Sequence, residues 1–493
     1  MKTIYLSNEE REIFSMISEA VFANPFSDER LEIDRKISKS DYCLTRDQIF
    51  ERLTRTVEHY TIKLNNENRA NIKYYTDRDK SVITSFLLFE IFHKYIDRFD
   101  KLILKQMESG DKSCHVNFTN EIIKVFNDYG FSEDESLHYT ALFYQLRRAY
   151  YFITSLLIGK SKCMKQLRMH LWQNIFSYNL SWYDIHLNAR MEDFSTLLIG
   201  ETGTGKGSAA FAAGCSGFIP FDKTKQCFIE SFTRAFISIN LSQFSETLIE
   251  SELFGHKKGA FTGAIDSHQG VLARSSKCGA VFLDEIGDAS IPIQIKLLKV
   301  LQERIFSPVG SHEQLRFNGR VIAATNHTLR ELRKNKGFRE DFYYRLCSDI
   351  IELPPLRERI KEEPEELNEL IEHILKRMTG KKEAPKELLE FVEKSIFEKL
   401  GNDYHWSGNV RELEQCVRRI LLKGKYDGDI PKPAEKSGFL QSVETGSLNV
   451  EQLISGYIEI SLKKYKTVSE CAEKLGIDRR TVKKYSNLIP KMQ

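Results

Sequence analysis

The stretch Ser195-Thr-Leu-Leu-Ile-Gly-Glu-Thr-Gly-Thr-Gly-Lys206 predicts the fold of the central part of the chain. It begins with an apolar run typical of a buried strand, and a helical pattern follows from about Ser208. The glycines between them allow successive backbone N–H groups to turn toward an anion at the start of the helix. Lys206 adds a positive charge for the outer phosphates of a nucleotide. This order of strand, glycine loop and helix predicts a nucleotide-binding loop in a parallel α/β fold.

The residue after Lys206 departs from the usual pattern of such loops. Many of them carry a Ser or Thr there whose hydroxyl binds magnesium, whereas this chain has Gly207, and Ser208 comes one position late. We therefore expect magnesium to be held more by phosphate oxygens and water. The predicted nucleotide-binding residues of the loop are Gly200, Glu201, Thr202, Gly203, Thr204, Gly205, Lys206 and Gly207.

Three further apolar runs alternate with helical patterns, as expected for buried parallel strands: Ala235–Ile239, Ala280–Leu283 and Arg320–Ala324. The second run ends in the carboxylates Asp284 and Glu285. We expect Asp284 to hold magnesium and Glu285 to polarise the attacking water. An exposed acidic pair is the alternative, which the upstream phosphate loop makes the weaker interpretation.

A glycine-bracketed loop lies between the phosphate loop and the acidic pair. It comprises Gly259, Ala260, Phe261, Thr262, Gly263 and Ala264. A hairpin turn would explain the glycines, but it does not need a Phe at its tip, since Phe is more often buried. The loop is therefore interpreted as a contact surface.

These motifs together resemble the AAA+ domain of sigma-54-dependent transcription activators, the bacterial enhancer-binding proteins. The resemblance covers roughly Ser195 to Leu422, about half of the chain, and its motifs occur in the same order. Besides those above, they are Glu250–Ala264, Gly279–Asp288, Ala323–Asn326, Gly337–Leu346, Leu353–Arg359 and Trp406–Leu413.

The resemblance implies a role for several further side chains. Asn326 would sense the terminal phosphate, Asn240 would position Glu285, and Arg411 would be a second sensor on a helical lid. Arg339 and Arg345 would reach into the nucleotide site of a neighbouring subunit, where a planar guanidinium suits transition-state phosphate. The alternative for these arginines is surface ion pairing with Glu340 or Asp341.

The same resemblance implies the partners. An incomplete site in one subunit implies a homo-oligomeric ring, by family likeness a hexamer, that hydrolyses ATP with Mg²⁺. Hydrolysis would move the Gly259–Ala264 loop, which in the family engages sigma-54 RNA polymerase and opens promoters. Unlike the family, this chain has a longer segment between Lys206 and Phe236. It is either an insertion that contacts a neighbour or the N-terminal domain, or a plain surface loop.

The last part of the chain has the pattern of a helix-turn-helix. Ala472 permits close helix crossing, Gly476 supplies the turn, and Asp478 is a candidate N-cap. Residues 461–493 contain nine Lys or Arg and three Asp or Glu, a local balance of +6. Double-stranded DNA is the expected partner, read by base-edge and phosphate contacts. The candidate DNA-binding residues are Arg479, Arg480, Thr481, Lys483 and Lys484.

The first 165 residues predict a mostly helical domain that we expect to be regulatory. Apolar residues recur at helical spacing, and Leu137–Ile158 is rich in aromatic residues. The aromatic cluster would either line a ligand pocket or, as we favour, pack as core. No receiver-like arrangement of acidic strand ends is present in the sequence, so a ligand, a partner protein and self-inhibition stay open as inputs.

Composition sets the remaining limits. The 493 residues suggest about three domains. A net charge of +3 identifies no partner, and nine scattered cysteines without a Cys-x-x-Cys pair favour a reducing compartment. No signal peptide or stretch of ~20 apolar residues is present, so we expect a cytoplasmic protein.

The overall expectation is an α/β fold: an AAA+ P-loop parallel sheet with a helical lid, between a helical N-terminal domain and a helix-turn-helix domain. The alternatives are a P-loop ATPase that remodels another complex and binds nucleic acid non-specifically, and a non-catalytic DNA-binding repressor. The expected segments are a regulatory domain 1–165, an α/β subdomain 166–355, a lid 356–425, a linker 426–450 and a DNA-binding domain 451–493.

Overall fold

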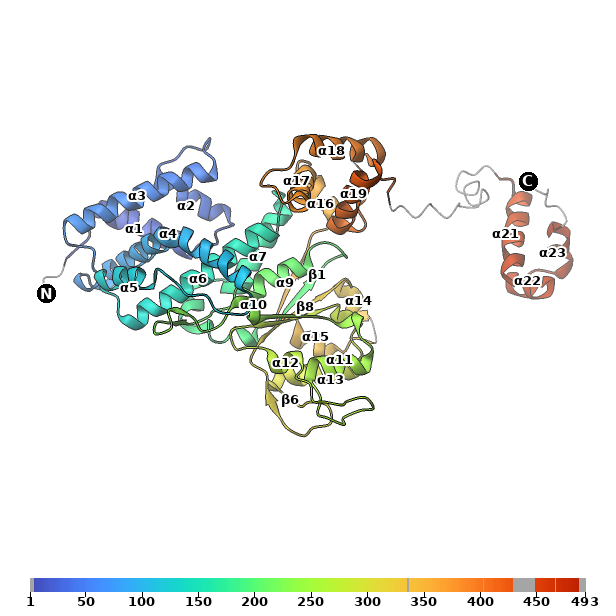
Figure 1. The fold of residues 1–493 in the computed structure, drawn as a ribbon. Helices are drawn as coiled ribbons and strands as arrows, with labels where there is room; N and C mark the ends of the chain where they lie inside the picture. Colours follow the sequence, from blue (N-terminus) through green and yellow to red (C-terminus); the bar gives the residue numbers. More distant parts are fainter. Residues whose placement is uncertain (1–3, 335–336, 402, 429–447, 466, 487–493) are drawn as a thin grey trace. The chain divides into compact units, whose positions relative to one another are not determined.

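A parallel five-stranded sheet with the order β4-β5-β8-β1-β9 forms the framework of the computed structural model (Figure 1). Four strands lie where apolar runs predicted them. The fifth was missed because Asp349 and Glu352 leave only Ile350 and Ile351 as an apolar signal. The strands are β1 Thr196–Ile199, β4 Phe236–Asn240, β5 Ala280–Asp284, β8 Arg320–Thr325 and β9 Asp349–Glu352.

The structure describes residues 4–334, 337–401, 403–428, 448–465 and 467–486. The chain forms two compact units, Met1–Tyr426 and Asp427–Gln493. Most of the linker expected at 426–450 falls on residues 429–447, outside the described residues. No described helix is long and apolar enough to cross a membrane.

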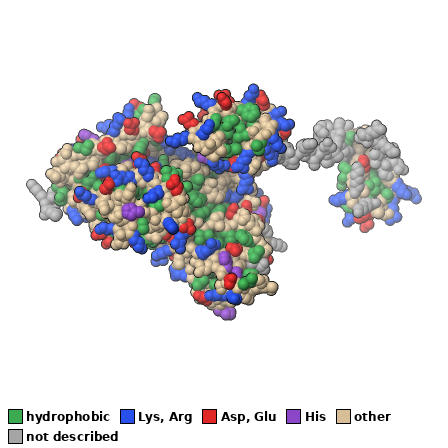
Figure 2. All heavy atoms as spheres, in the orientation of Figure 1, with side chains coloured by type: hydrophobic (Ala, Val, Ile, Leu, Met, Phe, Trp, Pro, Cys, Tyr) green, Lys and Arg blue, Asp and Glu red, His purple; other side chains and the backbone are tan. Residues whose placement is uncertain are grey.

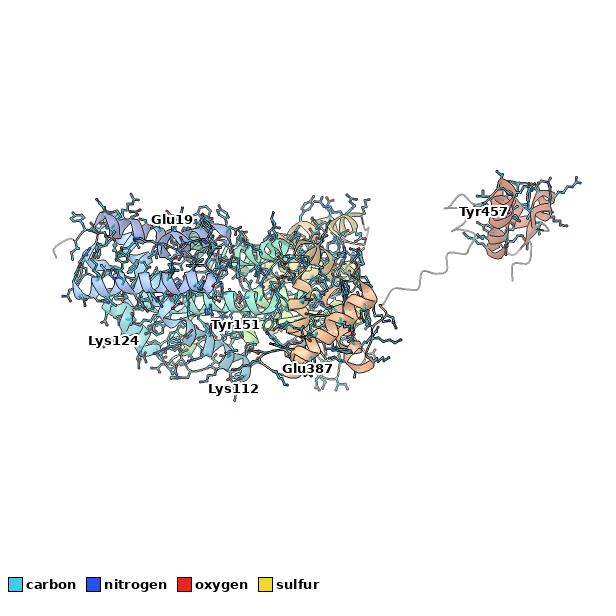
Figure 3. The ribbon with its side chains drawn as sticks, turned by 90° about the horizontal axis from the view of Figure 1, so that it is seen from above. Glu19, Lys112, Lys124, Tyr151, Glu387 and Tyr457 are labelled. Atoms are coloured by element: carbon cyan, nitrogen blue, oxygen red, sulfur yellow. The ribbon has the colours of Figure 1, made fainter. Side chains whose placement is uncertain are left out.

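The N-terminal part of the first unit is helical, as predicted (Figure 1). Several of these helices begin with a polar N-cap, and Ser7 with Glu10 and Thr45 with Gln48 form complete capping boxes. Figure 3 shows these helices side by side from above, with Glu19 labelled on α1 and Tyr151 on α6. They are α1 Asn8–Phe22, α2 Asp28–Ser38, α3 Arg46–Asn66, α4 Asp77–Ser109, α5 Thr119–Asp128, α6 Glu133–Leu156 and α7 Lys162–Phe176.

Short helices cover the sheet and connect its strands. The boundary expected at 165 falls inside α7, and Asn174 of that helix donates to Thr196 of β1 at 2.9 Å. The helices are α8 Leu180–Trp182, a π-helical turn Tyr183–Leu187, α9 Lys206–Gly214, α10 Phe232–Ala235, α11 Glu246–Phe254, α12 Val271–Arg274, α13 Ile291–Glu303, α14 Leu329–Lys334 and α15 Glu340–Leu346.

The long segment between Lys206 and Phe236 contacts the N-terminal helices. It contains a hairpin of β2 (Phe221–Asp222) and β3 (Cys227–Phe228). The Phe228 ring stacks on Tyr144 of α6 with centroids 4.0 Å apart, and Val116 N–H donates to the Gln226 carbonyl at 2.8 Å. Of the alternatives considered, the structure therefore supports an insertion that packs on the N-terminal domain.

Helix α6 also holds the end of α9, the helix that begins at the phosphate loop. The fully buried Arg148 donates to the carbonyls of Cys215 and Gly217, both at 2.7 Å. Gln145 donates to the Ser216 carbonyl at 2.8 Å. The N-terminal helices and the α/β layer thus share one hydrophobic core.

The lid is a four-helix group with its own core around Ile371, Val392, Trp406 and Val417. Its buried Glu366 accepts a hydrogen bond from Arg359 of the lid. Glu366 also accepts one, at 2.7 Å, from the N–H of Ser161, the residue just before α7. The lid therefore contacts the N-terminal helices directly. Its helices are α16 Leu356–Glu362, α17 Glu366–Thr379, α18 Lys386–Leu400 and α19 Asn409–Lys423.

The second unit contains three described helices, α21 Val450–Tyr465, α22 Val468–Leu475 and α23 Arg479–Ser486. Their small core is formed by Ile458, Cys471, Ala472 and Val482, with Val468, Leu475 and Ile477 packed around it.

Candidate active site

The phosphate loop lies between β1 and α9, with α9 beginning at Lys206 as the sequence order requires. Gly203 and Gly205 have φ angles of +82° and +101°, which L side chains rarely adopt. A Cβ on Gly203 would also lie 2.2 Å from the Gly408 carbonyl oxygen of the lid. The loop therefore needs glycine both for its backbone angles and for the close approach of the lid.

The side chain of Lys206 folds back onto the phosphate loop. Its buried ammonium donates to the carbonyls of Gly200 at 2.7 Å and Glu201 at 3.2 Å. Burial lowers the pKa of Lys206, and the nearby carboxylates of Glu285 and Asp284 oppose that shift. The ammonium is thus held at the mouth of the loop by carbonyl groups that a phosphate oxygen could replace.

The acidic pair ends β5. Glu285 has a left-handed backbone (φ +55°), and its Oε2 is buried without a hydrogen-bond partner among the described residues. Burial raises the pKa of Glu285, the Asp284 charge adds to this, and a backbone hydrogen bond from Asn326 opposes it. The structure thus brings Asn326, which directly follows β8, next to Glu285.

Asn240 contacts a different carboxylate from the one expected. It pairs in register with Asp284 across β4 and β5, and its Nδ2 donates to Asp284 Oδ2 at 3.3 Å. Its Oδ1 accepts from the Ser242 N–H at 2.9 Å. In-register residues of adjacent strands lie opposite each other, so this geometry orients Asp284 directly and Glu285 only through its neighbour.

The donors present fit a nucleotide-bound magnesium ion. The described residues contain no group of three or more His, Cys, Asp or Glu able to hold a metal ion by itself. Magnesium typically uses one or two carboxylates together with phosphate oxygens and water. Asp284 supplies such a carboxylate, and a Cβ on Gly207 would meet only open space where many loops place a hydroxyl.

The lid contacts the phosphate loop through Arg357 and Asn409, two residues that lie within the motifs given above but to which the sequence assigned no role. Arg357 on α16 donates to both carboxylate oxygens of Glu201, at 2.8 and 2.6 Å, and this holds the pKa of Glu201 below its usual value. Asn409 donates to Glu201 at 3.1 Å and to the Thr202 carbonyl at 3.0 Å. The predicted sensor Arg411 also lies here, beside Gly203.

The two arginines expected to act in a neighbouring subunit have partners within their own chain. Arg339 forms a two-pronged ion pair with Asp341, at 3.0 and 2.7 Å, which is the surface pairing considered as the alternative. Arg345 donates to the Leu301 carbonyl at 3.0 and 2.9 Å. A role for either arginine across a subunit interface stays a prediction.

The glycine-bracketed loop projects Phe261. The Gly259 N–H donates to the Ala264 carbonyl at 2.8 Å and closes the base of the loop. Positions Gly259 and Gly263 have open space around them and φ angles of +79° and +101°. Phe261 is 38% exposed, with its ring edge-on to His256 at 4.9 Å.

The candidate DNA-binding residues lie on α23 of the second unit. Asp478 caps this helix by accepting the Arg480 N–H at 2.6 Å, and Gly476 ends α22 with φ +66°. Arg479, Arg480, Lys483 and Lys484 are exposed, whereas Thr481 is half-buried. Basic side chains stand out on this unit in Figure 2.

Two family descriptions match the chain: "Sigma-54 interaction domain" over residues 181–352 and "AAA+ ATPase lid domain" over residues 361–430. A Nif-specific regulatory protein of Azotobacter vinelandii is 41% identical over 239 residues, which is 48% of this chain and 41% of that protein. Regulatory protein AtoC of Escherichia coli (strain K12) is 31% identical over 327 residues, 63% of this chain and 66% of that protein. The match thus spans less than two thirds of the length of either relative.

Among solved structures, NtrX from Brucella abortus in complex with ADP aligns with a TM-score of 0.41 and 20% sequence identity. The alignment covers 76% of this chain and 80% of that one. At that TM-score it adds no support beyond the sequence matches.

Proposed function

The chain belongs to the sigma-54-dependent transcription activators, and on this premise we propose that it couples ATP hydrolysis to opening of promoters by sigma-54 RNA polymerase. ATP hydrolysis at the nucleotide site would move the Phe261 loop, this loop would contact and remodel the polymerase, and α23 would bind DNA. A location in the cytoplasm, where the polymerase acts, is part of the proposal.

ATP would bind with its phosphates at the start of α9. Lys206 would exchange its two carbonyl partners for phosphate oxygens, and Asp284 would hold magnesium, which neutralises phosphate charge when bound. Glu285 has a buried oxygen without a partner, as expected of a group waiting to accept a hydrogen bond from water. Asn326, whose backbone lies beside Glu285, would sense the terminal phosphate of the nucleotide.

The catalytic unit is proposed to be a ring of identical chains, a hexamer by family likeness. Arg339 and Arg345 would exchange their intramolecular partners for the nucleotide of the adjacent subunit. Arg339 is suited to this because its ion pair with Asp341 is solvent-exposed and so contributes little to stability. An arginine supplied by a neighbour accelerates hydrolysis by ~10³-fold or more in related phosphoryl transfers.

The observation that carries the proposed output is the exposed Phe261 on a loop closed at its base by Gly259 and Ala264. An aromatic side chain at the tip of a tethered loop can be inserted into a partner as one piece. The glycines allow the loop to change its backbone angles without steric conflict.

The test separates hydrolysis from promoter opening. Phe261→Ala is expected to keep ATPase activity within about twofold of wild type and to abolish open-complex formation, because Phe261 takes no part in hydrolysis. Glu285→Gln is expected to lower both by about 100-fold or more. The matched control is Phe244→Ala, which removes a ring of nearly equal exposure from the same α/β subdomain (Phe244 is 37% exposed and Phe261 38%).

Two outcomes would contradict this assignment. If Phe261→Ala still opened promoters fully, the Gly259–Ala264 loop would be only a turn and not the contact with the polymerase. ATP hydrolysis without any promoter opening by the wild-type chain would favour an ATPase that remodels another complex, and absence of hydrolysis would favour a repressor.

For DNA, we propose that α22 and α23 act as a helix-turn-helix. Arg479 and Arg480, at the start of α23, would approach base edges, and Lys483 and Lys484 would contact phosphates. Lys484→Ala should weaken binding to all duplexes alike and reduce the salt slope by about one unit. Arg480→Ala should weaken binding to the cognate site by ~1–3 kcal/mol and relax its specificity.

A further inference from the structure

A cavity of about 970 Å³ lies among the N-terminal helices. Its walls come from the end of α1, from α2, the start of α3, α4, α6, α7 and the π-helical turn. Ligand pockets commonly have volumes of ~300–1,000 Å³. The space is therefore large enough for a small molecule of two or more fused rings.

The wall of the cavity is mainly apolar and aromatic. Phe89, Phe92, Phe143, Tyr150 and Trp172 line it. Sequence analysis favoured core packing for the aromatic residues of α6. Tyr144 and Phe152 do pack in the core, whereas the opposite side of the same helix faces the cavity.

The charged groups in the wall either have a hydrogen-bonding partner or are exposed to water. Arg30 pairs with Asp34 at 2.8 Å, and Arg147 pairs with Asp100 on α4 at 2.7 Å. Asp184 of the π-helical turn lies 2.6 Å from His138. Exposed Arg46, Asp47, Lys73 and Lys80 also border the cavity, where water screens their charge. The wall therefore favours a neutral ligand over an ion.

His93 is the polar group in the wall that determines which kind of ligand the cavity can recognise. Its Nδ1 lies 2.8 Å from the Phe89 carbonyl, so Nδ1 carries the proton and Nε2 is an acceptor. Among the described residues, Nε2 has no hydrogen-bond partner. Burial lowers the pKa of His93 to about 3, so the ring is neutral at pH 7. An unused acceptor in an aromatic wall recognises an O–H or N–H donor.

We propose that this cavity binds a neutral aromatic small molecule that carries one O–H or N–H group, which donates to His93 Nε2. Aromatic faces supply the apolar contact area, and the single acceptor orients the ligand. This is the small-molecule choice among the inputs that the sequence left open for the N-terminal domain.

The cavity is connected to the phosphate loop through α6. Leu146, Arg147 and Tyr150 face the cavity, whereas Gln145 and Arg148 on the opposite side donate to the three residues that directly follow α9. A ligand that shifts α6 would therefore move the helix whose first residue is Lys206. This regulatory step rests on the proposed ATPase function, whereas binding of the ligand does not.

The binding test uses the full chain without nucleotide and isothermal titration calorimetry with three probes. They are 2-naphthol, 2-methoxynaphthalene, which lacks the donor, and 2-naphthoate, which is anionic at pH 7. We expect saturable binding of 2-naphthol and about tenfold weaker binding of the other two. Equal affinities for naphthol and its methyl ether, or tightest binding of naphthoate, would overturn the assigned ligand class.

Two variants locate the probe. His93→Phe keeps an aromatic ring but removes the acceptor, so it should bring 2-naphthol to the affinity of its methyl ether; exposed His59→Phe is its control. Leu146→Trp places a larger ring in the wall of the cavity and should weaken binding by about tenfold or more, whereas Leu104→Trp, on the exposed side of α4, should not. Unfolding temperatures within a few degrees of wild type show that the variants are folded. Unchanged binding in folded Leu146→Trp would place the probe elsewhere and overturn the site.

The regulatory step is read from the ATPase rate at saturating 2-naphthol. We expect the rate to change by threefold or more in wild type and, at the same 2-naphthol concentration, by much less in Leu146→Trp. Binding with an unchanged rate would refute the connection through α6. A chain that hydrolyses no ATP under any condition would refute the proposed function, while the calorimetric result would still decide the cavity.

Discussion

Arg357, on the first helix of the lid, donates to both carboxylate oxygens of Glu201 in the phosphate loop, at 2.8 and 2.6 Å. The two residues are 156 positions apart in the chain. Lid position and loop conformation are consequently set together, because neither residue can move without breaking a charge-assisted hydrogen bond.

A double-mutant cycle on this pair measures the connection. Glu201→Gln, Arg357→Gln and the double variant should give a coupling of about 0.5–1 kcal/mol in nucleotide binding, a modest value because both side chains are partly exposed. The readout is the dissociation constant of a fluorescent ATP analogue. The pair Arg377–Glu414, on the lid surface, should show no coupling to nucleotide, and the same coupling in both pairs would contradict a specific role.

Two glycines of the loop should respond to substitution in opposite ways. Gly203→Ala places a Cβ 2.2 Å from the Gly408 carbonyl oxygen at φ +82°, so nucleotide affinity should fall by about tenfold or more. Gly207→Thr meets open space and adds a hydroxyl, so the half-saturating Mg²⁺ concentration should fall by about threefold or more. Magnesium titrations of ATPase activity check the second result, and an unchanged requirement would show that the hydroxyl does not reach the ion.

The N-terminal domain should lose stability in acid through Glu10. Burial alone would raise its pKa, but hydrogen bonds from Arg69, the Ser7 N–H and Lys63 hold it at about 2 instead of the usual 4.5. A depressed carboxyl pKa stabilises the fold above pH 4.5, here by ~2–3 kcal/mol, and that contribution is lost as the pH falls toward 2.

Urea unfolding of Glu10→Gln at several pH values tests this. The variant should be less stable than wild type at pH 7, and the difference should shrink by about half by pH 3. Glu67→Gln, which removes the exposed partner of Arg69, should have a small effect. A difference that does not change with pH would contradict the role of Glu10 ionisation.

Removing Arg148 should loosen the attachment of the N-terminal helices to α9. Arg148→Met leaves two carbonyl groups without donors, and we expect a loss of about 2–4 kcal/mol in unfolding free energy. Arg98→Met breaks an exposed ion pair with Glu121 and should change stability by less than about 0.5 kcal/mol. Equal losses in the two variants would show that burial of Arg148 adds nothing.

The α/β core could be predicted because its strands are buried on both faces and read as continuous apolar runs. Val281 to Leu283, fully buried in β5, is such a run, whereas the edge strand Asp349–Glu352 is too short and polar to stand out. The phosphate loop was equally predictable, since its function depends on neighbours in sequence.

Contacts between segments far apart in the chain could not be predicted from the sequence. Nothing near Glu201 indicates that Arg357 or Asn409 will reach it, because that depends on how the lid packs. The same holds for the cavity: Tyr144 and Tyr150 have similar sequence surroundings, yet the first stacks on Phe228 and the second lines the empty space. An aromatic residue at helical spacing predicts burial without distinguishing a packed wall from a ligand-lined one.

Glu366 gives the lid a second attachment, since its buried carboxylate accepts hydrogen bonds from both Arg359 and the Ser161 N–H. The N-terminal helices therefore contact two of the elements that carry the nucleotide site: α9, just beyond its last residue, and the lid. Thermodynamic linkage then requires reciprocity: if a ligand in the N-terminal cavity changes ATP affinity by some factor, ATP must change the affinity for that ligand by the same factor. A chain loaded with ATP would thus sense its signal at a different threshold from an empty one.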